Sequence, residues 1–264
     1  MKYIESLQNS TIKNILKLQE KSRERKKNGE FIIEGRREIS LAIKGGYEVA
    51  TLLFCDAYIN QVEINEFTID TTELISVSKE VYQKIAYRNS TEGVLAIAKT
   101  KGFLLENINF STSTPLILVA EAPEKPGNIG ALLRTCDAAN IDAVFIANPK
   151  TDMYNPNVIR SSVGCLFTNQ IATASTEEII AFLKENNINS FATTLQNSNE
   201  YHKENYTKAS AIIVGTESEG LSEELRNAAT KNINIPMQGA IDSMNVSVAA
   251  AIVIFEAKRQ REFK

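Results

Sequence analysis

Residues 116–147 read LILVAEAPEKPGNIGALLRTCDAANIDAVFIA, and this segment decides the fold. Two uninterrupted apolar runs, 116–121 and 143–147, flank a stretch whose apolar residues recur with the spacing of a helix. Strands that are apolar on both faces and joined through a helix are typical of a parallel sheet covered on both sides. The segment therefore predicts an α/β domain.

The same alternation continues toward the C-terminus. Apolar strands are predicted at 190–195, 211–215 and 232–236, with helices near 176–186 and 222–229 and a long helix from about 245. Because ligands of open parallel sheets bind at the loops that leave the carboxyl ends of the strands, these loops are where we expect a site.

Toward the N-terminus the periodicity stops at 101–114, a stretch that ends in a Ser/Thr cluster and predicts a linker. Before it, residues 1–100 predict a smaller α/β domain. Its strands are expected at 31–35, 49–56 and 93–100, its helices at 36–44 and 79–87, and one or two further helices within 3–27. The second domain is predicted to span 115–264.

The composition excludes several classes of protein. In 264 residues no apolar stretch reaches membrane-spanning length, and the N-terminus lacks the apolar core of a signal peptide, so a cytoplasmic location is expected. Cys55, Cys136 and Cys165 form no CxxC pair, which favours buried reduced thiols over disulfides or a zinc knuckle. The single histidine, His202, excludes a zinc site of several imidazoles, and no metal is expected.

The net charge of −3 does not suggest a nucleic-acid-binding protein, but the charge is unevenly distributed. A basic stripe near the N-terminus is placed to contact phosphates. Its residues are Lys13, Lys17, Lys21, Arg23, Arg25, Lys26 and Lys27, followed by Arg36 and Arg37. The alternative interpretation is a solvated helix face.

The loop after the first apolar strand contains neither a P-loop nor a GxGxxG motif. Asn128 is predicted to be the N-cap of the following helix. Arg134, one turn or more into that helix, is placed to reach a phosphate or a ribose. The alternative for this residue is a surface arginine paired with Asp137.

A second loop, within AIIVGTESEGLSEEL at 211–225, carries Glu217 between Gly215 and Gly220. The glycines allow a tight turn or a close approach of a ligand to the backbone. Ser222 and the acids after it are typical of a helix start. A plain turn with exposed acids is the alternative.

The third segment, 233–261, predicts a strand, a loop and a helix that is apolar nearly all round and is therefore expected to be buried on several sides. Residues 249–251 are alanines, which permit close packing in the core or at a subunit interface. Ser243 and Asn245 place polar groups at the helix start. The apolar neighbours of these two residues in the loop are Ile235, Met237 and Met244.

Together these segments resemble the SpoU/TrmH family of ribose 2′-O-methyltransferases, within the SPOUT superfamily. The resemblance covers the second domain and rests on three ordered motifs: NxGxxxR at 128–134, GxExxG at 215–220, and IPM followed by SMNVSVA at 235–249. The family usually has leucine where this chain has Met244, which keeps an apolar group. The first domain resembles the ribosomal-protein-like RNA-binding module that often precedes this catalytic domain.

The resemblance implies a deep trefoil knot, formed where the C-terminal chain passes through a loop, with S-adenosylmethionine bound in the knotted loops. It places Gly215, Ile235 and Met244 against this cofactor, largely through backbone groups, with Thr194 and Met237 nearby. It also implies a homodimer in which the knotted regions pack together, for which the alanines at 249–251 offer a surface.

By the same resemblance, Arg134 acts on the ribose 2′-hydroxyl, while four residues position it and the substrate: Asn128, Glu217, Ser243 and Asn245. A free arginine is a poor base because its pKa exceeds about 12, so we interpret Arg134 as a residue that binds and orients phosphate. The expected substrate is structured RNA, ribosomal RNA before transfer RNA. The alternatives are a noncatalytic RNA-binding protein and a different nucleotide-dependent α/β enzyme.

Overall fold

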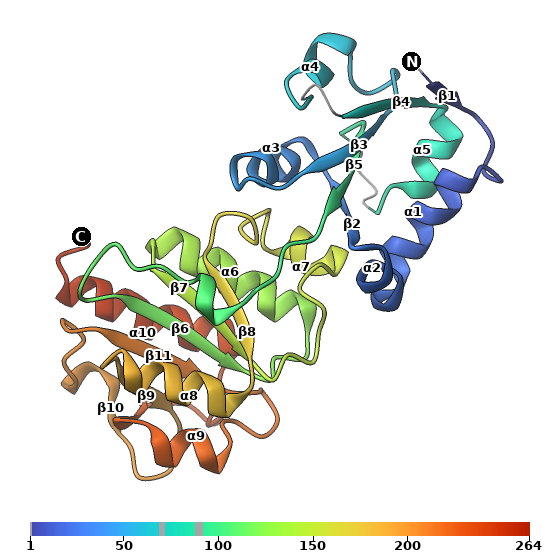
Figure 1. The fold of residues 1–264 in the computed structure, drawn as a ribbon. Helices are drawn as coiled ribbons and strands as arrows, with labels where there is room; N and C mark the ends of the chain where they lie inside the picture. The colour runs from blue at the N-terminus through green and yellow to red at the C-terminus, as the bar shows by residue number, and fades with distance from the viewer. Residues whose placement is uncertain (1, 69–71, 88–91) are drawn as a thin grey trace. The chain divides into compact units, whose positions relative to one another are not determined.

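The computed structural model describes residues 2–68, 72–87 and 92–264. These residues divide by their packing into two compact units (Figure 1). The first unit holds the residues up to 102 together with 152–168, and the second holds 103–151 and 169–264. Each unit has its own sheet.

The first unit contains a mixed sheet. Its described strands are β1 (Lys2–Ile4), β2 (Glu30–Glu34), β3 (Val49–Phe54), β4 (Glu73–Val77) and β5 (Val94–Lys99). They lie in the order β1-β4-β3-β5-β2, parallel from β1 to β3 and antiparallel on both sides of β5. The helices are α1 (Ser10–Glu20), α2 (Ser22–Asn28), α3 (Arg36–Lys44), α4 (Gln61–Asn65), α5 (Lys79–Ile85) and α7 (Pro156–Ser161).

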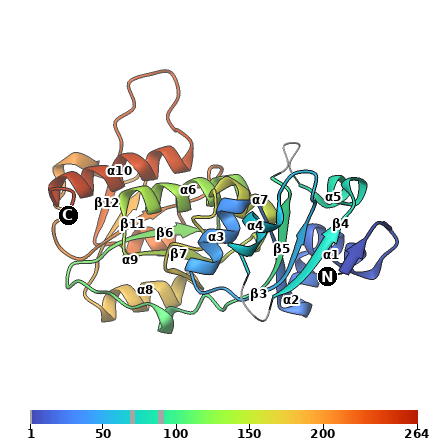
Figure 2. The ribbon, with the colours of Figure 1, turned by 90° about the horizontal axis from the view of Figure 1, so that it is seen from above.

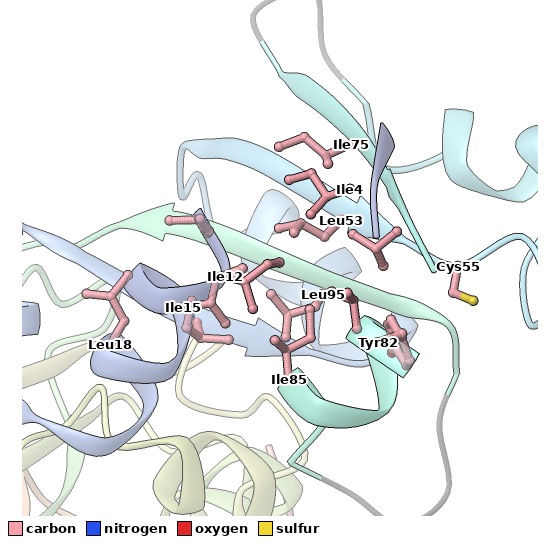
Figure 3. Packing of buried hydrophobic residues seen from close by; sticks show 14 residues of the cluster. Ile4, Ile12, Ile15, Leu18, Leu53, Cys55, Ile75, Tyr82, Ile85 and Leu95 are labelled. Carbon is pink, nitrogen blue, oxygen red and sulfur yellow. The ribbon is translucent and has the colours of Figure 1, made fainter. Parts of the chain in front are cut away.

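Helices α1 and α5 bury their apolar faces in one cluster with the sheet (Figure 3). Ile12, Ile15 and Leu18 follow the three-residue spacing that puts side chains on one helix face, and all are fully buried. They share the cluster with Tyr82 and Ile85 of α5. Burial of each such side chain contributes roughly 1.5–3 kcal/mol, so this cluster holds the two helices on the sheet.

The predicted strands at 31–35, 49–56 and 93–100 correspond to β2, β3 and β5, and the predicted helices at 36–44 and 79–87 to α3 and α5. Residues 3–27 form a strand and then two helices, not helices alone. The sequence did not predict β1, β4, α4 or α7, because elements of three to six residues seldom establish a periodicity.

Residues 152–168 pack in the first unit, which differs from the predicted division at 115. The reason is aromatic packing. The rings of Tyr154 and Phe31 have centroids 4.3 Å apart, and those of Phe167 and Tyr47 are 5.0 Å apart. The predicted linker also differs, because from residue 103 the chain belongs to the second unit, where the Thr173 amide donates to the Phe103 carbonyl at 2.8 Å.

The basic stripe is smaller than predicted. Arg25 is only 3% exposed, and its Nε donates to the Asp152 carboxylate at 2.6 Å. Arg36 is half-buried and paired with Glu63 at 2.5 Å. Both ion pairs lie within the first unit. The exposed members are Lys13, Lys17, Lys21, Arg23, Lys26, Lys27 and Arg37.

The second unit has a parallel sheet, as predicted. Its described strands are β6 (Leu116–Glu121), β7 (Ala143–Ala147), β8 (Ile171–Ala174), β9 (Asn189–Thr193), β10 (Asn199–Glu200), β11 (Ser210–Val214) and β12 (Lys231–Asn234). They lie in the order β10-β12-β9-β11-β6-β7-β8, and every pair is parallel. Only β8 and β10, of four and two residues, were not predicted.

Helices cover both faces of this sheet. Figure 2 shows α6 (Pro126–Ala139) and α10 (Val246–Gln260) together on one face, and α8 (Thr176–Glu185) with α9 (Glu223–Ala228) on the other. Every residue of β6, β7 and β11 is buried, as two covered faces require. The sequence predicted these four helices.

Helix α10 differs from its prediction in one respect. Ala250, Val253 and Ile254 are fully buried, but Val248 and Phe255 are 50% and 42% exposed. The helix therefore presents an apolar face to solvent in the single chain. Across the described residues no helix is both long and apolar enough to cross a membrane, and all three cysteines are buried thiols.

Candidate active site

The loops that follow β6, β9, β11 and β12 lie at the carboxyl edge of the parallel sheet, and the last three surround an open hollow. This large hollow has a volume of about 380 Å³, and its lining residues come from 193–196, 214–221, 233–237 and 242–249. Sites for small molecules typically enclose roughly 300–1000 Å³. The large hollow therefore has room for a nucleoside-sized ligand.

All five residues predicted to meet the cofactor line this hollow, although they come from four separate segments: Thr194, Gly215, Ile235, Met237 and Met244. Three of them, Ile235, Met237 and Met244, are half-buried, so they offer apolar surface without being sealed in the core. Glu217 and Ser243 line the same hollow.

The glycines of the 215–220 loop are required by its geometry. A side chain at Gly215 would place its Cβ 2.2 Å from the backbone carbonyl carbon and oxygen of Gly220. Gly220 itself has φ of +72°, in the left-handed region. Two backbone hydrogen bonds between Thr216 and Gly220, of 3.0 and 3.1 Å, close the loop. The tight turn predicted from the two glycines is confirmed.

The charges around the large hollow have one sign. Its charged lining residues, within the part of the chain described, are Glu217, Glu219 and Asp242, and no lysine or arginine is among them. Such a lining favours a cation and disfavours a phosphate.

Glu217 is the centre of a polar cluster built from three loops. Its Oε1 accepts a hydrogen bond from Asn245 Nδ2 at 2.8 Å, and its Oε2 forms an ion pair with Lys125. Asn245 also donates to Asn128 Oδ1 at 3.2 Å. Hydrogen bonds to the carboxylate, from Lys125 first and then from Asn128, hold the pKa of Glu217 below its usual range. Glu217 is therefore an ionised, oriented carboxylate.

Asn128 reaches this cluster from a position that the sequence did not predict. Helix α6 begins at Pro126, and its N-cap is Lys125, so Asn128 lies inside the first turn. Proline is favoured at the first helical position, which moves the helix start three residues earlier than expected. Asn245, in contrast, is the N-cap of α10, and its Oδ1 accepts from the Ser247 amide at 2.9 Å.

A second, small hollow of about 90 Å³ shares the lining residues 215–218 with the large one. Lys125, Asn128 and Leu132 line it, together with Glu217. Sequence reasoning missed Lys125. The one feature of the sequence that could have indicated its role is a lysine at the N-cap of a helix, where serine, threonine, aspartate or asparagine is preferred.

Below the cluster, the buried carboxylate of Glu121 fixes the loop after β11. Its Oε2 accepts from the Ser222 amide at 2.8 Å, and its Oε1 from the Thr176 hydroxyl at 3.1 Å. Ser222 is the N-cap of α9, as predicted. Within the described ranges no group of three metal-ligating side chains is present.

Comparison with known proteins agrees with this geometry. The SpoU rRNA methylase family model matches residues 115–255, which hold every loop described above. The chain belongs to this family. A model of the MRM3-like substrate binding domain matches residues 9–96, in the first unit.

Several relatives of this SpoU family member match along nearly its whole length. The 23S rRNA (guanosine(2553)-2'-O)-methyltransferase RlmP of Bacillus subtilis is 28% identical, over 98% of this chain and all of that protein. A crystal structure of an RNA 2'-O ribose methyltransferase is 38% identical, with a TM-score of 0.85 over 98% of this chain and 99% of that one. The AdoMet-bound rRNA methyltransferase from Sinorhizobium meliloti is 28% identical, with a TM-score of 0.90 over 98% and 97%.

The SpoU motifs quoted above do not all converge. Asn128, Glu217 and Asn245 make mutual hydrogen bonds, and Ser243 lines the large hollow. Arg134 is exposed on α6 and lines neither hollow.

Proposed function

We propose that the protein transfers a methyl group from S-adenosylmethionine to a ribose 2′-hydroxyl of RNA, with ribosomal RNA as the substrate. The observation that carries the proposal is the large hollow, which combines apolar walls with purely acidic charge beside an ionised carboxylate. A cationic sulfonium nucleoside fits such a lining, whereas cofactors with phosphate groups do not. When bound, this cofactor supplies the electrophilic methyl group.

The residues of the large hollow divide the work of binding. Ile235, Met237 and Met244 pack against the adenine ring, while main-chain groups at these positions meet its polar edge. Gly215 lets the backbone come close, and Thr194 bounds the hollow on the side of β9. The acids Glu217, Glu219 and Asp242 favour the positive charge.

The polar cluster orients the acceptor. Glu217, ionised and held on both oxygens, accepts a hydrogen bond from the ribose, and Asn128, Ser243 and Asn245 supply amide and hydroxyl groups around it. Arg134, exposed and outside both hollows, binds a phosphate of the RNA. Its high pKa makes it unsuited to removing the hydroxyl proton.

The first unit selects the RNA. In support, residues 9–96 match a substrate-binding family model, and seven exposed cationic side chains lie on or near α1, α2 and α3. Such cations contact phosphates, and RNA loops are where base identity is accessible.

Two further features of the family extend the proposal. The C-terminal chain passes through a loop to form a deep trefoil knot; in support, Asn245, which follows β12, donates hydrogen bonds to Asn128 in the first turn of α6 and to Glu217 in the loop after β11. Two copies pair through α10, whose exposed Val248 and Phe255 form an apolar face next to α6. Sedimentation at micromolar concentration tests the pairing, because Phe255→Asp should yield a monomer.

The rivals are a noncatalytic RNA-binding protein and another nucleotide-dependent enzyme. Isothermal titration with S-adenosylmethionine and with ATP separates them: we expect heat only with the former. Methyl transfer to total RNA from a strain lacking the protein, followed by mapping of 2′-O-methyl groups, identifies the substrate. Binding without transfer to any RNA would favour the noncatalytic rival, and modification of transfer RNA alone would replace the ribosomal substrate.

A further inference from the structure

Lys125 belongs to none of the family motifs quoted above, yet it contacts the carboxylate at their centre. We propose that Lys125 is a positioning residue of the methyl-transfer site, which holds the Glu217 carboxylate in a fixed orientation toward Asn245. The inference rests on the proposed function, and its test below has a readout that does not depend on that function.

The contacts leave Glu217 little freedom. Its two oxygens are bound from opposite partners, Oε1 by Asn245 and Oε2 by Lys125. Lys125 comes from the loop after β6, 92 residues away along the chain. Without the ammonium group, one carboxylate oxygen loses its charged donor, and the side chain can turn into either hollow.

The position of Lys125 is unfavourable for the helix that it begins. It is the N-cap of α6, it makes no side-chain capping hydrogen bond, and a cation at a helix N-terminus opposes the helix dipole. Residues that break a local rule of stability are expected at functional sites. A role in the site explains why a lysine occupies this position.

Stability does not explain the ion pair. The Lys125 side chain is 70% exposed and that of Glu217 is 30% exposed, and ion pairs with this exposure contribute little to folding. Their effect is on the carboxylate itself. The hydrogen bond from Lys125 is the largest cause that lowers the pKa of Glu217, so it extends the range of pH over which this group accepts hydrogen bonds.

The experiment compares Lys125→Met, which removes the charge, with Lys125→Arg, which keeps it. Lys150→Met is the matched control, because Lys150 is an exposed lysine on the loop after β7 that lines neither hollow. For each variant, kcat and KM for RNA are measured as functions of pH. Titration of the Glu217 carboxyl carbon by NMR gives its pKa in the wild type and in each variant.

We expect Lys125→Met to lower kcat roughly five- to tenfold, the effect of losing one partly exposed charged hydrogen bond, with little change in KM. The acid limb of kcat should move to higher pH, and the carboxyl pKa should rise. Lys125→Arg should restore both, and Lys150→Met should change neither. In a Glu217→Gln background Lys125→Met should have no further effect.

Two results would overturn the inference. An increase in KM alone would make Lys125 an RNA contact, and an unchanged carboxyl pKa in Lys125→Met would show that it does not hold Glu217. If the wild-type protein transferred no methyl group, the proposed function would fail, but the NMR titration would still decide the role of Lys125.

Discussion

Replacing Gly215 with alanine tests how the large hollow is built. The added Cβ would lie 2.2 Å from the carbonyl carbon and oxygen of Gly220 and 2.5 Å from the Leu221 amide nitrogen. All three are backbone atoms, which cannot turn aside like a flexible side chain. The loop must therefore open, and the two hydrogen bonds between Thr216 and Gly220 must break. At about 0.5–1.5 kcal/mol each, their loss destabilises the protein by about 1–3 kcal/mol.

Because the same loop forms one wall of the large hollow, Gly215→Ala should also weaken binding of S-adenosylmethionine. We expect Kd to rise tenfold or more, which corresponds to a loss of about 1.4 kcal/mol of binding free energy. Gly239→Ala is the matched control: a Cβ there meets nothing within 4 Å, and the backbone needs no positive φ. Titration calorimetry and urea unfolding measure both effects. Wild-type affinity and stability in Gly215→Ala would refute the account of this loop.

Three further predictions concern separate parts of the chain. Arg134→Ala should bind S-adenosylmethionine as the wild type does but lose methyl transfer, because Arg134 lines neither hollow; unchanged turnover would remove it from the mechanism. Neutralising four exposed lysines, Lys13, Lys17, Lys26 and Lys27, should weaken RNA binding. The slope of log binding constant against log salt concentration should become shallower by about 0.7–0.9 for each phosphate that is no longer neutralised. Filter binding at several salt concentrations measures both effects. Glu121→Ala leaves the Ser222 amide and the Thr176 hydroxyl without their acceptor. Thermal unfolding should therefore show that the free energy of unfolding falls by roughly 2–3 kcal/mol. Stability equal to that of the wild type would mean that water replaces the carboxylate.

The features that the sequence predicted are those that local patterns encode. Buried parallel strands are continuous apolar runs, and a turn that admits no Cβ demands glycine at positions such as Gly215. The sequence-based predictions fail where the environment of a residue depends on a partner that is distant along the chain. Arg25 is buried because Asp152, 127 residues later, accepts its hydrogen bond. Lys125 is a site residue because of Glu217, and neither pairing leaves a periodic trace in the sequence.

Asn128 shows a second kind of error, in which two local rules compete. Asparagine favours an N-cap and proline favours the first helical position, and in 125–128 the two rules place the helix start at different residues. The proline decides, since its ring fixes φ near the helical value before any hydrogen bond forms. The consequence concerns the site. An asparagine used as an N-cap would turn its oxygen to its own helix, whereas Asn128, inside the first turn, directs its amide group toward Glu217 and Asn245.

The distribution of charge links the two proposed ligands. The methyl donor carries positive charge at the reacting sulfur, and the acceptor is surrounded by phosphates. Among the described residues no lysine or arginine lines the large hollow, and Lys125, the N-cap of α6, and Arg134, within α6, both lie outside it. Glu217 lines both hollows. In the proposed function this ionised carboxylate attracts the sulfonium and accepts a hydrogen bond from the ribose hydroxyl, and both roles depend on the orientation that Asn245 and Lys125 give to its two oxygens.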